Sequence, residues 1–127
     1  MNINNLFNFI MKKDSLLIIC LILINIVTIS LLIDKPLKLF TINAILLICY
    51  FLATDRKNKY ILFFASLNFA FWGVVFESLI IKNTNFGLRY KTNGEGYNVP
   101  LWLFTTYMTF LISAVFTYEA YSAMLKN

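Results

Sequence analysis

The chain has 127 residues, of which 60% are hydrophobic and only 13% are charged, with a net charge of +5. Soluble domains carry about 25% charged residues, so this chain has too few to cover a surface in water. Its mean hydropathy of +0.73 excludes disorder, which needs low hydrophobicity. The composition predicts an all-α, multi-pass integral membrane protein whose first partner is the lipid bilayer.

The residue counts also exclude several kinds of chemistry. The chain has no histidine, which rules out histidine-based catalysis and histidine metal ligands. Two cysteines cannot form a zinc site alone, and the four glycines form no phosphate-binding loop. The positive charge is too dispersed for a nucleic-acid interface. We therefore predict no catalytic set, no metal site, no cofactor and no nucleic-acid partner.

Residues 1–14 are predicted to form an amphipathic helix in the membrane surface, preceding a single transmembrane domain over residues 15–127. Apolar residues recur with helical spacing and asparagines occupy the other side, with Phe9 as the exception. A cleaved signal peptide is the alternative, but the following apolar run is too long for one. The apolar positions are Ile3, Leu6, Phe7, Ile10 and Met11.

Four apolar runs are each suited to cross a bilayer as a helix, which takes about 20 residues. Charged or polar segments separate them, and residues 82–98 form a long polar loop. The short connections between the first three runs predict antiparallel neighbours in an up-down four-helix bundle. The predicted spans are residues 15–33, 37–54, 60–81 and 100–124.

The distribution of basic residues favours termini on the cytoplasmic side. The end of the predicted bundle that holds both termini has six Lys or Arg residues, and the opposite end has five. Three of the six lie within residues 55–59, and such clusters are typical of cytoplasmic loops. We therefore place both termini in the cytoplasm.

Glu119 and Glu77 are the two acidic residues inside the predicted spans. Carboxylates are costly in the membrane, so both are candidate functional groups. At the rise of an α-helix, the two carboxylates lie about 15–20 Å apart along the membrane normal. One chain therefore cannot use both acids at one site. For Glu119 we favour an interfacial ion pair with Lys59 or Arg56.

Glu77 ends a stripe of small residues on its helix, a pattern that allows another helix to pack closely. The favoured interpretation is a packing seam, with Glu77 paired to a cation of the adjacent loop. The alternative is a carboxylate that lines a cleft and binds a proton or a cation. The small residues are Ser66, Ala70 and Gly73, and the loop cations are Lys82, Arg89 and Lys91.

Asn68 lies about 180° around the helix from Glu77, so it belongs to a different interface. Its partner in depth on the last span is Ser113, which forms a hydroxyl stripe with Thr109 and Thr117. We expect this stripe to hydrogen-bond across helices. A water path is the alternative.

The first two spans predict a hairpin in which Asn25 lies level with Asn43 and Cys20 lies level with Cys49. We expect the asparagines to face each other directly, because unsatisfied amides are costly in lipid. The cysteines are predicted to be buried thiols. A disulfide between them is the alternative.

Aromatic residues gather near both ends of the predicted bundle, which is typical of interfacial belts. Trp72 instead lies near mid-depth beside Gly73, where we expect helix packing, with a ligand-stacking platform as the alternative. The belt residues are Tyr97 and Trp102 at one end and Tyr60, Tyr118 and Tyr121 at the other.

Residues 77–110 resemble a loose group of uncharacterised small multi-pass membrane proteins of microbes and giant viruses. The resemblance rests on Glu77, on the Phe-Gly-Leu-Arg-Tyr segment that holds Arg89 and Tyr90, and on the Val-Pro-Leu-Trp-Leu segment around Trp102. It implies no established activity. Four helices in a short chain also resemble small multidrug-resistance transporters, but the first span lacks their essential acid.

Three functions fit these observations. We favour an interaction or structural membrane protein that assembles with itself or with other membrane proteins through the face of Ser66, Ala70 and Gly73. The alternative is an oligomeric small transporter or channel with Glu77 as its titrating carboxylate. A lipid-modifying intramembrane enzyme ranks last. The candidate functional or ligand-lining residues are Glu77, Asn68, Trp72, Arg89, Tyr90, Trp102 and Glu119.

Overall fold

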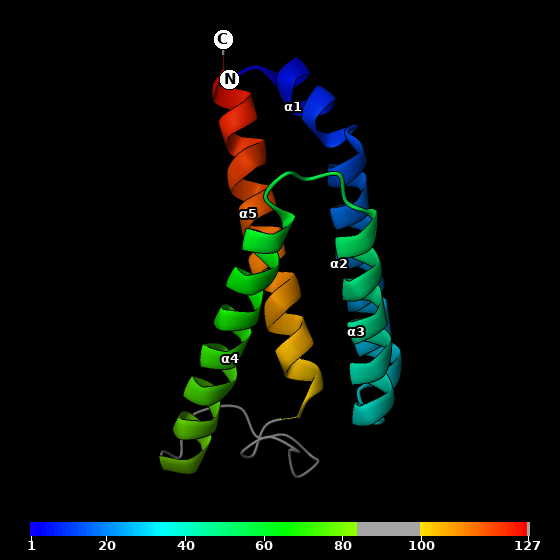
Figure 1. Cartoon of the computed structure of the whole chain (residues 1–127), viewed down its shortest axis with the longest axis vertical. Coiled ribbons are helices and arrows are strands. Elements are labelled where there is room, and N and C mark those ends of the chain that lie inside the picture. Colours follow the sequence, from blue (N-terminus) through cyan, green and yellow to red (C-terminus); the bar gives the residue numbers. More distant parts are fainter. Residues whose placement is uncertain (84–99, 127) are drawn as a thin grey trace.

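The computed structural model describes residues 1–83 and 100–126, which form a four-helix bundle preceded by a short helix (Figure 1). Four of the helices are long and apolar enough to span a membrane, so the predicted all-α, four-helix transmembrane bundle is confirmed as the fold class. Their ends lie within two residues of the predicted spans. Most of the predicted loop at residues 82–98 lies outside the described residues. The helices are α1 (Ile3–Ile10), α2 (Lys13–Leu32), α3 (Pro36–Ala53), α4 (Lys59–Asn83) and α5 (Trp102–Leu125).

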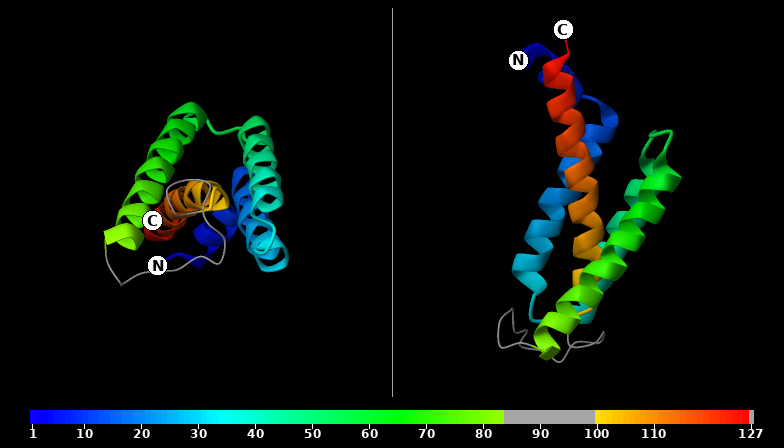
Figure 2. Two further views of the ribbon diagram at one scale, coloured as in Figure 1. Left: turned by 90° about the horizontal axis from the view of Figure 1, so that it is seen from below. Right: turned by 90° about the vertical axis from the view of Figure 1, so that its left-hand side faces the viewer.

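Helix α5 is the centre of the bundle. It contacts α1, α2, α3 and α4, and the left view of Figure 2 shows it between α4 on one side and the α2–α3 pair on the other. Met108 and Ile112 of α5 lie in the main apolar core, together with Ile18 of α2 and Leu47 of α3. The last helix of the chain therefore joins the two halves of the bundle.

Helices α3 and α4 are antiparallel but do not pack along their length, contrary to the prediction from their short connection. They touch at the connected end, where the rings of Phe51 and Phe63 meet edge to face at 5.1 Å. An apolar cavity of about 430 Å³ lies between the two helices at this end, and from there they diverge (Figure 1). The extensive contact of α4 is with α5.

Small residues of α4 make the contact with α5. Ser66 and Ala70 are completely buried, and a Cβ atom added to Gly73 would lie 3.0 Å from the ring of Tyr107. This is the close approach that small residues allow between membrane helices. The predicted packing seam is therefore present within one chain, and α5 covers the face to which we assigned assembly with a partner.

The polar contact inside the α2–α3 hairpin differs from the predicted one. The buried carbonyl oxygen of the Asn43 side chain accepts a hydrogen bond from Thr28 Oγ1 at 3.0 Å. Asn25 is buried as well, but no hydrogen bond joins the two asparagines among the described residues. Cys20 and Cys49 are both free and exposed, so the prediction of buried thiols is wrong and the alternative disulfide is not formed.

The hydroxyl stripe of α5 bonds within its own helix. Thr109 Oγ1 donates to the carbonyl oxygen of Thr105 at 3.1 Å, and Thr117 Oγ1 donates to that of Ser113 at 2.8 Å. A hydroxyl on a helix can always reach the carbonyl one turn earlier. The expected hydrogen bonds of this stripe to another helix are therefore not formed by Thr109 and Thr117.

Helix α1 lies across the end of the bundle and is fastened to the end of α5. The side chain of Asn2 caps α1 by accepting from Asn5 N, and Asn5 Nδ2 donates to the carbonyl oxygen of Lys126 at 2.9 Å. The ring of Phe9 stacks on Phe116 of α5 at 5.6 Å. Phe9, the exception to the amphipathic pattern, therefore helps to anchor the helix to the bundle.

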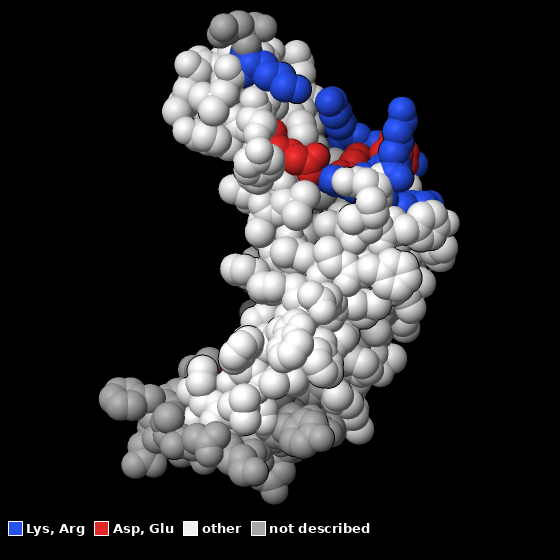
Figure 3. Space-filling model, turned by 60° about the vertical axis from the view of Figure 1, so that its left-hand side comes forward, with Lys and Arg blue, Asp and Glu red and all other residues white. Residues whose placement is uncertain are grey.

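Charged side chains gather at the end of the molecule that holds both termini. Figure 3 shows Lys, Arg, Asp and Glu side chains together at this end and a broad uncharged surface next to it. A charged end next to an apolar band is typical of a membrane protein with charges at the headgroup layer, and Asp34, Lys35 and Lys38 lie at the opposite end, in or near the α2–α3 connection. The basic residues at the end with the termini are Lys12, Lys13, Arg56, Lys57, Lys59 and Lys126.

The arrangement predicts that both termini lie on one side of the membrane. In a chain with Cys20 and Cys49 replaced by serine, we expect a membrane-impermeant thiol reagent to label Asn2→Cys and Lys126→Cys equally in sealed vesicles. Lys35→Cys, in the α2–α3 connection, should react only from the other side. Labelling of one terminus with protection of the other would contradict an even number of spans.

Candidate functional site

Arg56 lies in the connection between α3 and α4 and binds carboxylates from two other helices. Its Nη2 atom is 2.8 Å from Asp14 Oδ2 of α2 and 2.8 Å from Glu119 Oε1 of α5. The Arg56 side chain is 10% exposed, against 19% for Asp14 and 35% for Glu119. The predicted Glu119–Arg56 ion pair is therefore present, and it belongs to a larger network that ties three parts of the chain together.

Asp14 is the most extensively bonded member of this network. Its Oδ1 atom accepts hydrogen bonds from Tyr50 Oη at 2.9 Å and from Thr54 Oγ1 at 2.6 Å, both on the last turn of α3 or directly after it. Asp14 also lies in the first turn of α2, where the helix dipole stabilises a negative charge. These contacts fix the hairpin of α2 and α3 at its open end.

The charge of Arg56 is held by its acidic neighbours. Burial alone would lower the pKa of Arg56, but the hydrogen bonds and charges of Glu119 and Asp14 outweigh burial and raise the pKa above its ordinary value. Glu119 Oε1 meets the guanidinium as an ion pair, 2.8 Å from Nη2. Arg56 therefore remains a permanent cation between two acids.

A polar hollow of about 500 Å³ lies beside this network, between α1 and the end of α5. Its walls offer amide, hydroxyl and ammonium groups and the carboxylate of Glu119, at the end of the molecule where we expect headgroups and water. Within the described residues, no cluster of cysteine and acidic side chains is arranged to hold a metal ion. The polar lining residues include Asn5, Asn8, Lys12, Ser122 and Lys126.

Glu77 lies in the other half of the bundle, where Tyr107 of α5 donates a hydrogen bond from its hydroxyl to Glu77 Oε1. The ring of Tyr107 fits over Gly73 and meets Phe69 edge to face at 5.8 Å. The absence of a side chain at Gly73 is what lets the ring lie flat against α4 and reach Glu77. The predicted loop partners Lys82, Arg89 and Lys91 have side chains outside the described residues.

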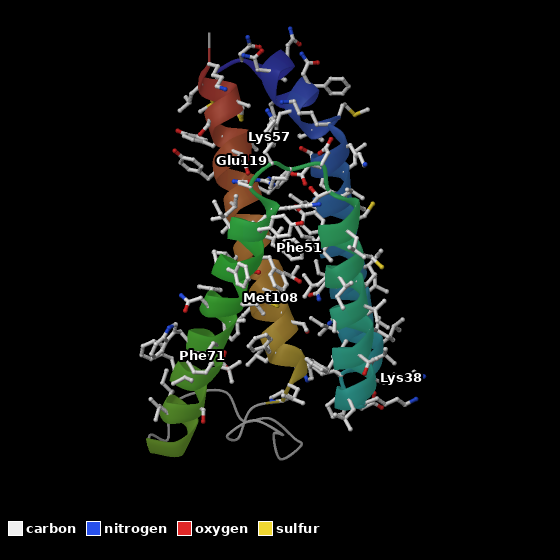
Figure 4. All side chains as sticks on the ribbon, in the orientation of Figure 1. Lys38, Phe51, Lys57, Phe71, Met108 and Glu119 are labelled. Carbon is white, nitrogen blue, oxygen red and sulfur yellow. The ribbon has the colours of Figure 1, made fainter. Side chains whose placement is uncertain are left out.

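The two membrane acids do not share a site. Tyr107, the partner of Glu77, and Glu119 are twelve residues apart on α5, which corresponds to about 18 Å along the helix. Figure 4 shows Glu119 near the end with the termini, facing the α3–α4 connection. The separation predicted from the sequence therefore holds.

The other predicted site residues are dispersed. Trp102 is buried against Leu39 and Leu103 rather than placed in a lipid-facing belt. Asn68 and Trp72 are exposed on the outer surface of α4, so Trp72 is not buried against another helix of the described chain. Arg89 and Tyr90 lie outside the described residues.

Sequence reasoning missed Asp14, Tyr50 and Thr54. A usable signal was present: Asp14 and Thr54 are each twenty residues from Asp34 in the hairpin turn, so they lie level across the hairpin. This spacing predicts a polar contact, because it brings an acid at the start of one span close to a tyrosine and a threonine near the end of the next span. The signal was missed because Asp14 was assigned to the amphipathic segment.

We expect Arg56→Met to lower the free energy of unfolding by about 3 kcal/mol, since it leaves two acids close together without their cation. Glu119→Gln should lower it by less, about 1 kcal/mol, because the Glu119 side chain is 35% exposed and ion pairs that water reaches contribute little. Denaturant titration in mild detergent measures both values. The matched control is Lys57→Met in the same connection, at an exposed residue; equal losses for Lys57→Met and Arg56→Met would contradict the network.

A second prediction concerns the hydrogen bond between Tyr107 and Glu77. A double-mutant cycle of Tyr107→Phe and Glu77→Gln should give a coupling energy of about 0.6 kcal/mol or more, the average for hydrogen bonds between membrane helices. Gly73→Ala should reduce this coupling, because the new methyl group displaces the ring. Tyr118→Phe, at an exposed tyrosine, should change nothing, and strict additivity of the first two variants would show that the bond contributes no stability.

Comparison with protein-family models gives no match for this chain. No curated protein matches it, and no solved structure matches it either. The resemblance of residues 77–110 to small membrane proteins of microbes and giant viruses therefore stays a prediction. The function has to be argued from the contacts of the described residues.

Proposed function

We propose that this protein is a non-enzymatic integral membrane protein that acts by assembling with other membrane-embedded chains. The observation that supports this best is the way its polar groups are divided. The two membrane acids are bonded inside the chain, whereas α4 exposes an amide and aromatic rings on its outer surface. The polar groups inside the bundle thus stabilise the fold, and the exposed amide and aromatic rings of α4 are available for contact with another chain.

The internal bonding of the acids supports a structural role for them. Glu119 and Asp14 neutralise Arg56 and hold α2, α5 and the α3–α4 connection together. Glu77 accepts from Tyr107 and helps fix α4 on α5. Each acid thereby stabilises a contact between helices, which is a common use of polar groups in membrane proteins.

The position of α4 supports an assembly role for this helix. It lies at the edge of the bundle and packs extensively on α5 alone (Figure 2). Its outer surface carries large exposed side chains, among them Phe64, Phe71, Trp72 and Phe76. Aromatic residues are enriched at the cores of protein interfaces, and this surface has room for a further helix.

The alternative is an oligomeric transporter or channel that uses Glu77. It is favoured by the placement of Glu77 inside the α4 span, partly buried and bonded to a hydroxyl of α5. In such a protein the carboxylate would exchange a proton or a cation. The experiment that follows separates this function from assembly.

A photo-crosslinking residue at Phe71 of α4 should give protein adducts in the native membrane, because this side chain points outward. A probe at Val27 of α2, which is exposed to a similar degree, is the matched control and should give mainly lipid adducts. Denaturing gel electrophoresis of the products measures both. Equal adduct patterns from the two positions would contradict assembly through α4.

The same preparation tests the transporter alternative. In liposomes, the wild-type protein and Glu77→Gln should give the same proton and cation flux, close to that of protein-free vesicles. A flux that the wild type supports and a folded, monodisperse Glu77→Gln variant lacks would contradict the proposed function.

A further inference from the structure

We propose that α4 binds α4 of a second copy of this chain, in a parallel, symmetrical contact centred on Asn68. This inference rests on the proposed function, because it names the partner of the outer surface of α4. Three observations support the proposed contact: the position of the Asn68 amide, the spacing of the residues around it, and the place of α4 at the edge of the bundle.

Asn68 lies at the middle of the α4 span, which covers Lys59–Ile80, and its side chain is exposed on the outer surface. It makes no side-chain hydrogen bond to any residue of the described chain. In the bilayer core no water is available to replace such a bond. The described part of a single copy therefore leaves the donor and the acceptor of this amide unsatisfied at the depth where this is most costly.

Other exposed polar groups of the spans do not share this condition. The hydroxyls of Ser30, Thr41 and Thr117 each donate to a carbonyl oxygen of the preceding turn, at 2.9, 2.8 and 2.8 Å. They are satisfied by their own helix and need no partner. Asn68 is thus the exception among the exposed serine, threonine and asparagine side chains of the described spans.

A second copy satisfies this amide by symmetry. Two copies inserted in the same direction place their Asn68 residues at the same depth, on either side of a twofold axis. A carboxamide carries both donors and acceptors, so two of them can bond reciprocally. Such an isologous contact closes on itself as a dimer.

The residues around Asn68 have the spacing of a helix-pairing seam. They recur at intervals of four and three, the repeat by which two helices supercoil around each other. Asn68 occupies a central position of the seam, where an asparagine specifies register and the number of helices, and Ala65 provides a small neighbour for close approach. The seam consists of Ile61, Ala65, Asn68, Trp72, Val75 and Leu79.

The bundle leaves this seam accessible. It lies opposite the buried stripe of Ser66 and Ala70, so α5 cannot cover it. Phe71, beside the seam, points away from the bundle in Figure 4. None of the six seam residues is charged, and Figure 3 shows an uncharged surface between the charged end and the residues drawn in grey.

Disulfide cross-linking in membranes tests the geometry. In a chain with Cys20 and Cys49 replaced by serine, Ile61→Cys and Leu79→Cys should each form a dimer of twice the chain mass on mild oxidation. Ile45→Cys on α3, with a comparable exposure to lipid, is the matched control and should remain largely monomeric. Cross-linking of all three positions to the same extent would overturn the proposed seam.

Substitution of Asn68 tests the chemistry. In phosphatidylcholine vesicles, energy transfer between labelled copies should show that Asn68→Leu weakens dimerisation by about 5- to 30-fold, as expected for loss of hydrogen bonds between membrane helices. Asn68→Gln keeps the carboxamide and should retain most of the affinity. Thr41→Val removes an exposed hydroxyl that is already satisfied by its own helix, and it should have no effect.

The outcomes separate this inference from the function on which it rests. Dimerisation that is unchanged in Asn68→Leu would overturn the role of the amide. A chain that stays monomeric in vesicles but gives adducts of other masses from Phe71 in native membranes would overturn the second copy as partner and keep assembly through α4. A monomer with lipid adducts alone would overturn both.

Discussion

A guanidinium placed between two carboxylates at the membrane surface is the constraint on which the arrangement of the helices depends. Arg56 reaches Asp14 on α2 and Glu119 on α5 at 2.8 Å each, while Tyr50 and Thr54 bring α3 to the same aspartate. Removing the cation would leave two acids poorly solvated and close together, which is the costly way to break such a network. The network therefore fixes the level of α5 against the hairpin of α2 and α3, and α4 follows because it packs on α5.

The features that follow from transfer into lipid could be predicted from the sequence. The apolar runs gave all four long helices with ends correct to two residues, because the length of a span is set by the thickness of the bilayer. Depth along a helix follows from residue counting, so the separation of Glu77 from Glu119 and the pairing of Glu119 with Arg56 were predictable. Asp14 is also level with its partners, but it was assigned to the wrong segment, and its partners lie 36 to 42 residues away.

The features that depend on rotation about the helix axis could not be predicted in this way. Asn25 and Asn43 are level, yet Asn43 bonds to Thr28, because a small rotation of one helix selects another partner at nearly the same depth. Counting residues along a helix also cannot decide whether a hydroxyl bonds within its own helix or to another helix. Thr109 and Thr117 both bond within α5. The divergence of α3 from α4 has the same origin: small residues allow α4 to pack closely on α5, whereas α3 and α4 meet only at their connected end, where the rings of Phe51 and Phe63 touch.

The two asparagines Asn43 and Asn68 show how one physical requirement gives different roles. Both lie within apolar spans where an amide without a partner is unfavourable. Asn43 is buried, and its side-chain carbonyl oxygen accepts from Thr28 within the hairpin, whereas its Nδ2 atom has no partner among the described residues. Asn68 faces outward from a helix whose opposite side is covered by α5, so the described bundle places no partner beside it. The same requirement that pairs the Glu77 carboxylate and the Asn43 carbonyl oxygen inside the chain is the reason why we propose a group on another molecule as the partner of Asn68.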